Sequence, residues 1–326
     1  MKNKKVIILH NNVLDKSFKD ELDNLIESEE VSQALIGLGY EPIKLAFINN
    51  IDFLINKTQK IKPKFVFNLV ETVNGDGRLA HFAPALLEHL DIPFSGCSST
   101  AIFLTSNKIL CKQILKNHGI PTPLWFTLTN FKTEKFQKGN YIVKPIWEDA
   151  SIGIDSESIK YCNTKNELLI FLETREKKIK KECMAEFYID GREFNISVIS
   201  DKNKKIKILP IAEIVFTNYN DKFKIIDYNA KWNEDSFEYK NTNRTFEFPK
   251  NDKILLKKLK DIVLKCAQIF ELQGYSRIDL RVDKNNKPYI LEINANPCIS
   301  KNARIAAAAQ YAGYDYKKLI FSLIPK

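Results

Sequence analysis

Residues 276–297 read SRIDLRVDKNNKPYILEINANP, and the pattern within this stretch decides the fold. In its first half, charged residues alternate with Ile278, Leu280 and Val282, and a strand with this period of two places the charged side chains on one face. The turn DKNNK leads into a second alternating run, so the stretch predicts a β-hairpin. The polar residues expected on one face of the hairpin are Arg277, Asp279, Glu292 and Asn294.

Two carboxylates and an amide oxygen on one sheet face form a hard, all-oxygen set of ligands. Such a set suits Mg²⁺, which is commonly bound by only a few protein ligands while substrate phosphates supply its other ligands. The hairpin therefore predicts a magnesium site at Asp279, Glu292 and Asn294. An exposed hairpin with alternating charges is the alternative that these residues leave open.

Three further segments carry groups suited to a phosphorylated ligand. Lys144 ends the apolar run YIVKP and Lys108 lies in SNKILCK, where each is placed to project toward phosphate. The loop WEDASIGI at 147–154 offers backbone N–H groups that can cover phosphates. In AEFYIDGREF at 185–194, backbone groups can pair with an adenine edge and a carboxylate with ribose hydroxyls. Surface lysines and a plain β-turn are the simpler alternatives, and no glycine-rich dinucleotide or Walker motif occurs.

The order of the expected elements indicates a parallel α/β unit followed by two smaller mixed lobes. We predict an N-terminal domain over 1–104, a central lobe over 105–188 and a C-terminal lobe over 189–326. Strands are expected at 5–10, 41–47, 64–70, 91–95, 141–145, 183–188, 194–200, 206–215, 275–282 and 288–293. Helices are expected at 20–38, 82–90, 105–118, 164–176 and 252–270.

Composition narrows the class of protein. The 326 residues include 50 Lys and Arg against 40 Asp and Glu, and the net charge of +10 keeps nucleic-acid binding as an alternative. The lysines are not interleaved with aromatic residues as a base-stacking surface requires. Six scattered cysteines show no metal-binding spacing, and no apolar run approaches the ~18 residues of a membrane span. Without a signal-peptide pattern, we expect a cytoplasmic protein with no nucleic-acid or membrane partner.

Taken in order along the chain, these motifs resemble those of the ATP-grasp superfamily and, within it, of the D-alanine–D-alanine ligase family. The most specific part is RIDL…LEINANP, and the resemblance extends from Glu30 to about Ile320. It implies the ATP-grasp fold, α/β and α+β, with a parallel pre-ATP-grasp domain followed by two ATP-grasp lobes. It also implies ATP with a pair of Mg²⁺ ions, or Mn²⁺ in their place, and a homodimer formed through the N-terminal domain.

The resemblance implies roles for individual residues as well. Arg277 matches the arginine that stabilises the tetrahedral intermediate, Lys231 the lysine that reaches the γ-phosphate, and Glu30 the glutamate that holds the first amino group. The magnesium ligands match Asp279, Glu292 and Asn294. The residues that match ATP contacts are Lys108, Lys144, Ser151, Glu186, Tyr188, Ile189 and Glu193.

Positions that contact the amino-acid substrates depart from the family pattern, whereas the metal positions match. Glu71 replaces a histidine, and Trp232 replaces the tyrosine of the mobile loop. Cys298 replaces the glycine after N-x-N-P, and Ala303 replaces the serine that binds the second substrate's carboxylate. Arg304 is the candidate to bind that carboxylate instead, through a bidentate contact; a solvated helix residue is the alternative.

We therefore expect an ATP-dependent carboxylate–amine ligase that joins amino acids or short peptides, or an amino acid and another amine, through an acyl phosphate. Water must be kept from this intermediate, and the segments 147–154 and 227–245 are the expected lids. A D-alanine–D-alanine ligase of peptidoglycan synthesis is the first alternative. A non-catalytic nucleotide-binding protein on the same fold is the alternative of another class.

Overall fold

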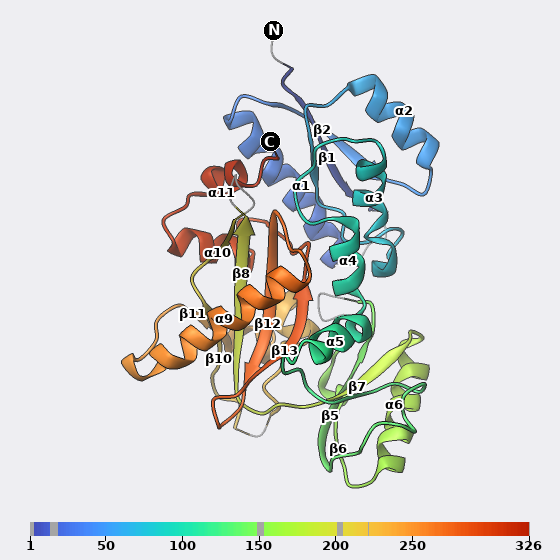
Figure 1. Ribbon diagram of the computed structural model, residues 1–326, viewed down its shortest axis with the longest axis vertical. Helices are drawn as coiled ribbons and strands as arrows, with labels where there is room; N and C mark the ends of the chain where they lie inside the picture. The colour runs from blue at the N-terminus through green and yellow to red at the C-terminus, as the bar shows by residue number, and fades with distance from the viewer. Residues whose placement is uncertain (1–2, 14–18, 149–152, 201–204, 221, 326) are drawn as a thin grey trace.

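Three sheets with surrounding helices follow one another along the chain (Figure 1). The computed structural model describes residues 3–13, 19–148, 153–200, 205–220 and 222–325. Ser151, expected to contact the nucleotide, lies outside these ranges. The first sheet is parallel and the other two are antiparallel, which confirms the expected combination of α/β and α+β architecture.

The N-terminal sheet has the strand order β2-β1-β3 and is built around the apolar strand β1. The strand expected at 91–95 does not form; Phe94 makes only an isolated bridge to Val66. Pro93 has no N–H to donate to a ladder, and its carbonyl accepts a hydrogen bond from Val66 N at 2.9 Å. The elements of this domain are β1 (Lys5–Asn11), α1 (Lys19–Gly37), β2 (Glu41–Phe47), α2 (Ile51–Ile61), β3 (Val66–Asn68) and α3 (Phe82–His89).

The central sheet has the order β4-β7-β5-β6, and helix α6 packs on it. Before this sheet, the single helix expected at 105–118 is divided into α4 and α5. Asn107 takes an extended backbone (φ −80°, ψ 100°), and its side chain accepts hydrogen bonds from the N–H groups of Ile109 and Leu110, so it caps α5. The elements are α4 (Ser99–Ser106), α5 (Lys108–Asn117), β4 (Trp125–Phe126), β5 (Gly139–Pro145), β6 (Ile159–Cys162), α6 (Lys165–Ile179) and β7 (Cys183–Phe187).

The third sheet has the order β11-β10-β8-β12-β13, with β9 also paired to β8. The strand expected at 206–215 is divided into β9 and β10, because Pro210 cannot donate to the ladder with β8. Leu259 and Val263 of α9 belong to the same apolar core as Ile278 of β12, and all three side chains are fully buried. The elements are β8 (Arg192–Ser200), β9 (Ile206–Ile208), β10 (Ala212–Phe216), α7 (Tyr228–Trp232), α8 (Phe237–Lys240), β11 (Thr242–Thr245), α9 (Lys253–Ile269), β12 (Tyr275–Val282) and β13 (Pro288–Asn294). Short 3₁₀ turns occupy Gly77–Leu79, Ser156–Ser158 and Lys250–Asp252.

The two last helices, α10 (Arg304–Tyr311) and α11 (Tyr316–Ser322), return to the N-terminal domain (Figure 1). Helix α11 packs on α1. A single apolar core contains Leu35 of α1, Ile305 of α10 and Ile320 of α11, each at most 1% exposed. The first and last parts of the chain therefore share a buried interface, which holds the N-terminal domain against the third sheet.

A close contact between two glycines adds to this interface. Gly274, just before β12, has φ +62°, and a Cβ at this position would lie 2.6 Å from the backbone of Gly96. Only glycine permits the two backbones to approach this closely. The contact fixes the start of the hairpin strand β12 against the end of the N-terminal domain.

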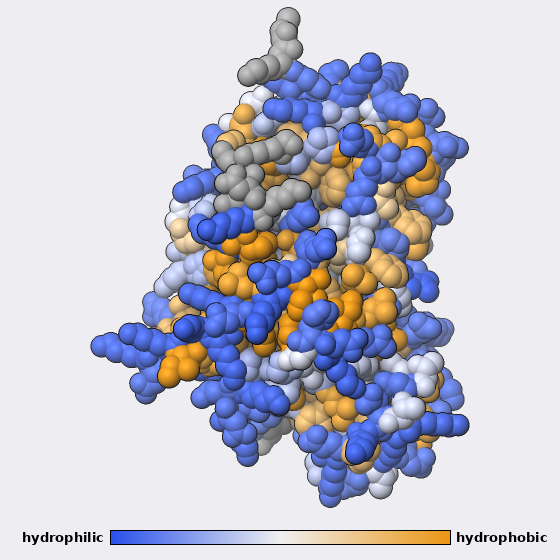
Figure 2. Space-filling model, viewed as in Figure 1, coloured by the Kyte–Doolittle hydropathy of each residue, from blue (hydrophilic) through white to orange (hydrophobic). Residues whose placement is uncertain are grey.

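Hydrophilic residues cover most of the face drawn in Figure 2, including the ridge of α9, and apolar residues show between the helices. Among the helices of the described ranges, none combines the length and apolar character that a bilayer crossing needs.

Candidate functional site

Two adjoining cavities lie where the sheets and the N-terminal domain meet. The first, which we call the narrow pocket, has a volume of about 100 Å³ and lies between the central and third sheets. The second, the wide cavity, has a volume of about 650 Å³ and reaches from the third sheet to the N-terminal domain. Lys231 and Arg304 line both cavities. A group bound in one cavity therefore lies beside a group bound in the other.

Six of the residues expected to contact the nucleotide line the narrow pocket. They are Lys108, Lys144, Glu186, Tyr188, Ile189 and Glu193. Lys144 lies on β5 and Glu186 on the neighbouring β7, with Lys144 Nζ 2.9 Å from Glu186 Oε1. Lys108 begins α5, and its Nζ donates to the carbonyl of Glu148 at 2.5 Å. Two ammonium-bearing side chains from different elements thus line the same pocket.

A third lysine, Lys112, pairs with the other oxygen of Glu186. Its side chain is only 2% exposed, and its Nζ also donates to Thr122 Oγ1 at 2.6 Å. Burial raises the pKa of Glu186, but the charges of Lys112 and Lys144 outweigh it and lower the pKa below its usual value. Lys112 was not expected as a site residue, although it follows Lys108 by four residues and therefore lies on the same side of α5.

Arg281 was also missed as a site residue, and it organises three of the expected ones. Its Nη2 lies 2.8 Å from Glu193 Oε2, and both side chains are buried. Its Nη1 donates to the carbonyl of Ile189 at 2.8 Å, and its guanidinium lies 4.8 Å from the ring centre of Tyr188. Alternation places Arg281 on the polar face of its strand, but only the pairing of β12 with β8 brings it opposite Glu193.

The polar face of the β12–β13 hairpin is directed at the cavities. Strand pairing places Asp279 opposite Glu292 and Arg277 opposite Asn294. Arg277 Nε lies 2.8 Å from Asp279 Oδ1, and Arg277 Nη2 lies 3.7 Å from Glu292 Oε1. Burial raises the pKa of Glu292, but Lys108, Arg277 and other nearby cations lower it to about 2. The three oxygen-bearing side chains of the expected magnesium site therefore lie on one face, and Glu292 is ionised at neutral pH.

The hairpin departs from strict alternation at one point. The register shifts between Asp279 and Leu280, and Leu291 as well as Glu292 lines the narrow pocket. Asn195 of β8 donates to Asp279 Oδ1 at 2.8 Å, so a neighbouring strand fixes the orientation of this carboxylate.

Cations are concentrated where the two cavities join. Lys231 lies on α7, whose first turn is capped by Asp227. Burial, with the nearby charges of Arg304 and Arg277, lowers the pKa of Lys231 to about 8. The pKa of Arg304 is also lowered, first by burial and then by Arg277, and its Nη1 lies 3.8 Å from Asp279 Oδ2. This junction favours an anion, because each of these cations repels the others.

Four positions that depart from the family pattern line the wide cavity together with the candidate carboxylate-binding arginine. They are Glu71, Trp232, Cys298, Ala303 and Arg304. The matching nucleotide positions line the narrow pocket instead. Most substrate positions and nucleotide positions therefore lie in different cavities, and Arg304 lines both.

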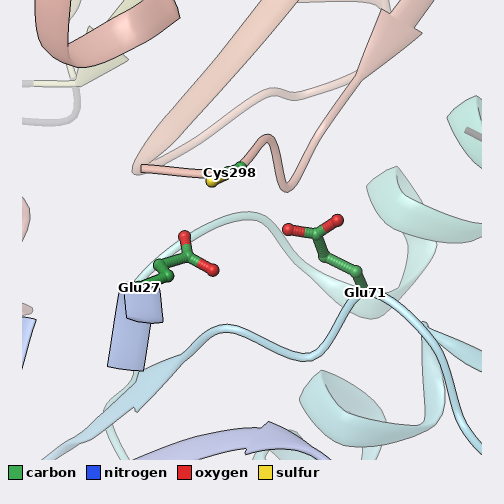
Figure 3. Close-up of side chains that lie close together, drawn as sticks. All are labelled: Glu27, Glu71 and Cys298. Carbon is green, nitrogen blue, oxygen red and sulfur yellow. The ribbon is translucent and has the colours of Figure 1, made fainter. Parts of the chain in front are cut away.

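A cluster that we call the acidic wall adjoins the wide cavity, and Figure 3 shows its side chains. Glu71 and Cys298 line the cavity, whereas the buried Glu27 is not among the described residues that do so. Glu27 of α1, Glu71 and Cys298 bring ligand atoms within 4.8 Å of one another. Burial raises the pKa of Glu27 well above its usual range, and the charges of Glu71 and Asp23 raise it further. Burial likewise raises the pKa of Cys298, and its thiol donates to Asp23 Oδ2 at 3.3 Å. The thiol therefore stays protonated.

Glu30, the glutamate expected from the sequence, lies one turn further along α1. Its carboxylate accepts a hydrogen bond from the backbone N–H of Lys301 at 2.6 Å. Glu27, three residues earlier, is 1% exposed and accepts from the N–H of Ile299 at 2.6 Å. Both carboxylates thus hold the loop after β13, and it is Glu27 that faces Cys298 and Glu71 (Figure 3). The i, i+3 spacing was the signal that two glutamates share this side of the helix.

Known proteins resemble this chain over nearly its full length. A family model described as "D-ala D-ala ligase C-terminus" matches residues 114–325. The D-alanine–D-alanine ligase of Aquifex aeolicus is 30% identical over 305 residues, covering 92% of this chain and 94% of the relative. That of Petrotoga mobilis is 31% identical over 307 residues, covering 94% and 93%.

A similar fold occurs in the crystal structure of D-alanine–D-alanine ligase from Bacillus anthracis complexed with ATP. The TM-score is 0.72 at 23% identity, with 98% of this chain and 96% of that chain covered. The resemblance stated from the sequence is confirmed, and so is the ATP-grasp architecture. The chain belongs to the D-alanine–D-alanine ligase family and is an ATP-dependent carbon–nitrogen ligase.

Proposed function

We propose that this ligase joins the carboxylate of one amino acid to the amine of a second amino acid, a short peptide or another amine through an acyl phosphate. The observation that carries the proposal is the junction of the two cavities at Lys231 and Arg304. A triphosphate in the narrow pocket would present its last phosphate to a carboxylate in the wide cavity. Holding two reactants in contact in this way removes much of the entropic barrier to their reaction.

In this proposal ATP occupies the narrow pocket. Lys108 and Lys144 bind phosphate oxygens, because both are buried cationic residues that line the pocket. Backbone groups of Tyr188 and Ile189 pair with the adenine edge, and Glu193, oriented by Arg281, accepts the ribose hydroxyls.

Asp279, Glu292 and Asn294 fit a magnesium site, since their two carboxylates and one amide oxygen are the donors that Mg²⁺ prefers. Mn²⁺ accepts the same ligands. A bound ion would neutralise negative charge on the phosphates. Arg277 and Asn195 orient the Asp279 carboxylate for this role.

The reaction then has two steps. A carboxylate oxygen of the first substrate bonds to the γ-phosphorus of ATP, the bond between that phosphorus and the bridging oxygen of ADP breaks, and Lys231 stabilises the transferred charge. The amine nitrogen next bonds to the acyl carbon, the carbon–oxygen bond to phosphate breaks, and the amine loses a proton. The Arg277 guanidinium stabilises the oxyanion between these two events.

The walls of the wide cavity suggest how an amino acid is oriented in it. We assign the ammonium group of the first substrate to the acidic wall, where Glu71 lines the cavity and the carboxylate of Glu27 lies within 4.8 Å of that of Glu71. The sequence resemblance gave this role to Glu30. We assign the carboxylate of the acceptor to Arg304, which can offer a bidentate contact. Trp232 and Cys298 supply wall surface, and Cys298 is not a nucleophile because its thiol stays protonated.

The substituted wall positions support substrates other than two D-alanines. Glu71, Cys298 and Ala303 each change the charge or shape of the cavity relative to the family pattern. D-Alanine is the second candidate, favoured by the names of the relatives.

A phosphate-release screen tests the proposed function. The protein is incubated with ATP, Mg²⁺ and single or paired D- and L-amino acids, and mass spectrometry identifies the amide product. We expect release that depends on a pair other than D-alanine with D-alanine. Ordinary turnover of D-alanine would overturn the substrate assignment. Phosphate release without any amide product across the panel would contradict the ligase reaction itself.

We also propose a homodimer through the N-terminal domain. Helix α1 exposes an apolar stripe of Leu22, Leu25, Ile26 and Ile36, which are 46%, 38%, 55% and 52% exposed. Contact with a second copy would remove this surface from water. Sedimentation velocity is expected to show a dimer that I26E dissociates, and a monomeric native protein would contradict the proposal.

A further inference from the structure

Three charged side chains are buried together at the base of the narrow pocket. The side chains of Lys112, Lys144 and Glu186 are 2%, 9% and 3% exposed. Glu186 Oε1 lies 2.9 Å from Lys144 Nζ, and Glu186 Oε2 pairs with Lys112 Nζ. One carboxylate is therefore shared by two ammonium groups, and the trio has a net charge of one positive unit.

The two lysines have different access to the pocket. Lys144 and Glu186 line it, whereas Lys112 is not among the described residues that do so. Lys112 is instead held on the far side: it donates to Thr122 Oγ1 at 2.6 Å, and that hydroxyl donates to the carbonyl of Ile290 at 2.8 Å. Its ammonium also lies 5.7 Å from the ring centre of Trp125.

This placement matters because charges interact strongly when they are shielded from water. If Lys112 were absent, Glu186 and Lys144 would form a closed pair with no net charge, and the pair would attract a phosphate only weakly. With Lys112 present, the negative charge of Glu186 is already balanced from the side away from the pocket. The positive charge of Lys144 is then available to an anion.

We propose that Lys112 is a positioning residue for nucleotide binding, which neutralises Glu186 so that Lys144 can bind phosphate. The inference rests on the proposed binding of ATP in the narrow pocket, and it assigns Lys112 to the phosphates and not to the base. The pKa directions agree: burial lowers the pKa of Lys112, while Glu186 and Glu292 overcome burial to raise that of Lys144.

The test measures direct binding of ATP, ADP and adenosine by calorimetry, with Mg²⁺ and without amino acids. K112M is compared with K116M, a change one turn further along α5 at a lysine whose side chain is 59% exposed. We expect K112M to weaken ATP binding by about tenfold, the scale of one lost charge-assisted contact, and adenosine binding little. K116M is expected to bind all three ligands like the native protein.

A rescue variant separates this role from a merely structural one. In K112M/E186Q the carboxylate that needs balancing is gone, so ATP binding is expected to recover relative to K112M. If K112M does not fold, E186Q and K112M/E186Q replace the comparison and are expected to bind ATP equally well.

Three results would overturn the inference: native ATP affinity in K112M, an equal loss for ATP and adenosine, or no recovery in K112M/E186Q. Failure of the native protein to bind ATP at all would refute the proposed nucleotide site instead. Native binding without amide formation would refute only the proposed reaction.

Discussion

At the scale of single residues, Glu292 is a carboxylate surrounded by cations of the site. Lys108, Arg277 and Lys144 all lower its pKa, which falls to about 2 in spite of burial. The same carboxylate is a proposed magnesium ligand. One side chain thus balances nearby cations and, in the proposed site, also serves as a metal ligand.

E292Q is expected to reduce ATP-dependent phosphate release by about 100-fold or more, the scale of losing a principal electrostatic contact in the transition state. The glutamine keeps the shape of the side chain but removes the charge. Phosphate release is measured with the best amine pair, and circular dichroism checks that the fold is retained. Turnover like that of the native protein would remove Glu292 from the metal site.

Lys231 gives the site a pH dependence. Its pKa is lowered to about 8, so the free protein carries the charged form below this pH and loses it as the pH rises. Because kcat/KM for ATP reports the free protein, we expect it to fall above about pH 8. In K231R the guanidinium stays charged, and this decline is expected to move to higher pH. An unchanged profile in K231R would assign the decline to another group.

At the scale of elements, the strand β12 is positioned by the contact between Gly274 and Gly96. Gly274 has φ +62°, and its Cβ would meet the Gly96 backbone at 2.6 Å. Gly313 also has a positive φ, +80°, but a Cβ there meets nothing within 4 Å. Both glycines therefore have a backbone conformation that favours glycine, but only at Gly274 would a Cβ also clash with a neighbouring residue.

G313A is expected to lower the free energy of unfolding by about 1–2 kcal/mol, from the left-handed backbone alone. G274A adds a steric conflict worth about 1–3 kcal/mol and is expected to lose more than G313A. Urea unfolding of both variants measures the difference. Equal losses would show that the two backbones can separate without cost.

At the scale of the whole molecule, one apolar core joins the N-terminal domain to the last two helices. Ile320 of α11 is fully buried in it, together with Leu35 of α1. The acidic wall depends on this arrangement, because Glu27 comes from α1 and Cys298 from the loop that precedes α10. The wide cavity therefore depends on contacts between the two ends of the chain.

I320A is expected to lower the free energy of unfolding by about 2–5 kcal/mol, as large-to-small changes in a buried core do. K317A, at an exposed position of the same helix, is the control and is expected to change it little. Both are measured by thermal or urea unfolding. A small loss for I320A would mean that α11 is not needed for the stability of the N-terminal domain.

The sequence predicted the elements with strong periodicity and failed where single residues interrupt it. The hairpin at 275–282 and 288–293 is confirmed to within one residue, because alternation over both strands leaves one register that buries the apolar face. The expected strand at 91–95 is wrong, and the helix at 105–118 is divided. Pro93 lacks the N–H that a ladder needs, and the Asn107 side chain accepts hydrogen bonds from the backbone of α5; an apolar pattern reveals neither effect.

By itself, the sequence determined the hairpin, the order of the motifs and the family, because these depend on local periodicity and on residues close together in the chain. Tertiary structure decided which charged groups meet. Lys112 and Glu186 are 74 residues apart in number, and Glu27 lies far from Cys298 along the chain, yet each pair shares one buried site. Such pairings follow from how strands and helices pack, since burial removes the water that would otherwise screen one charge from another.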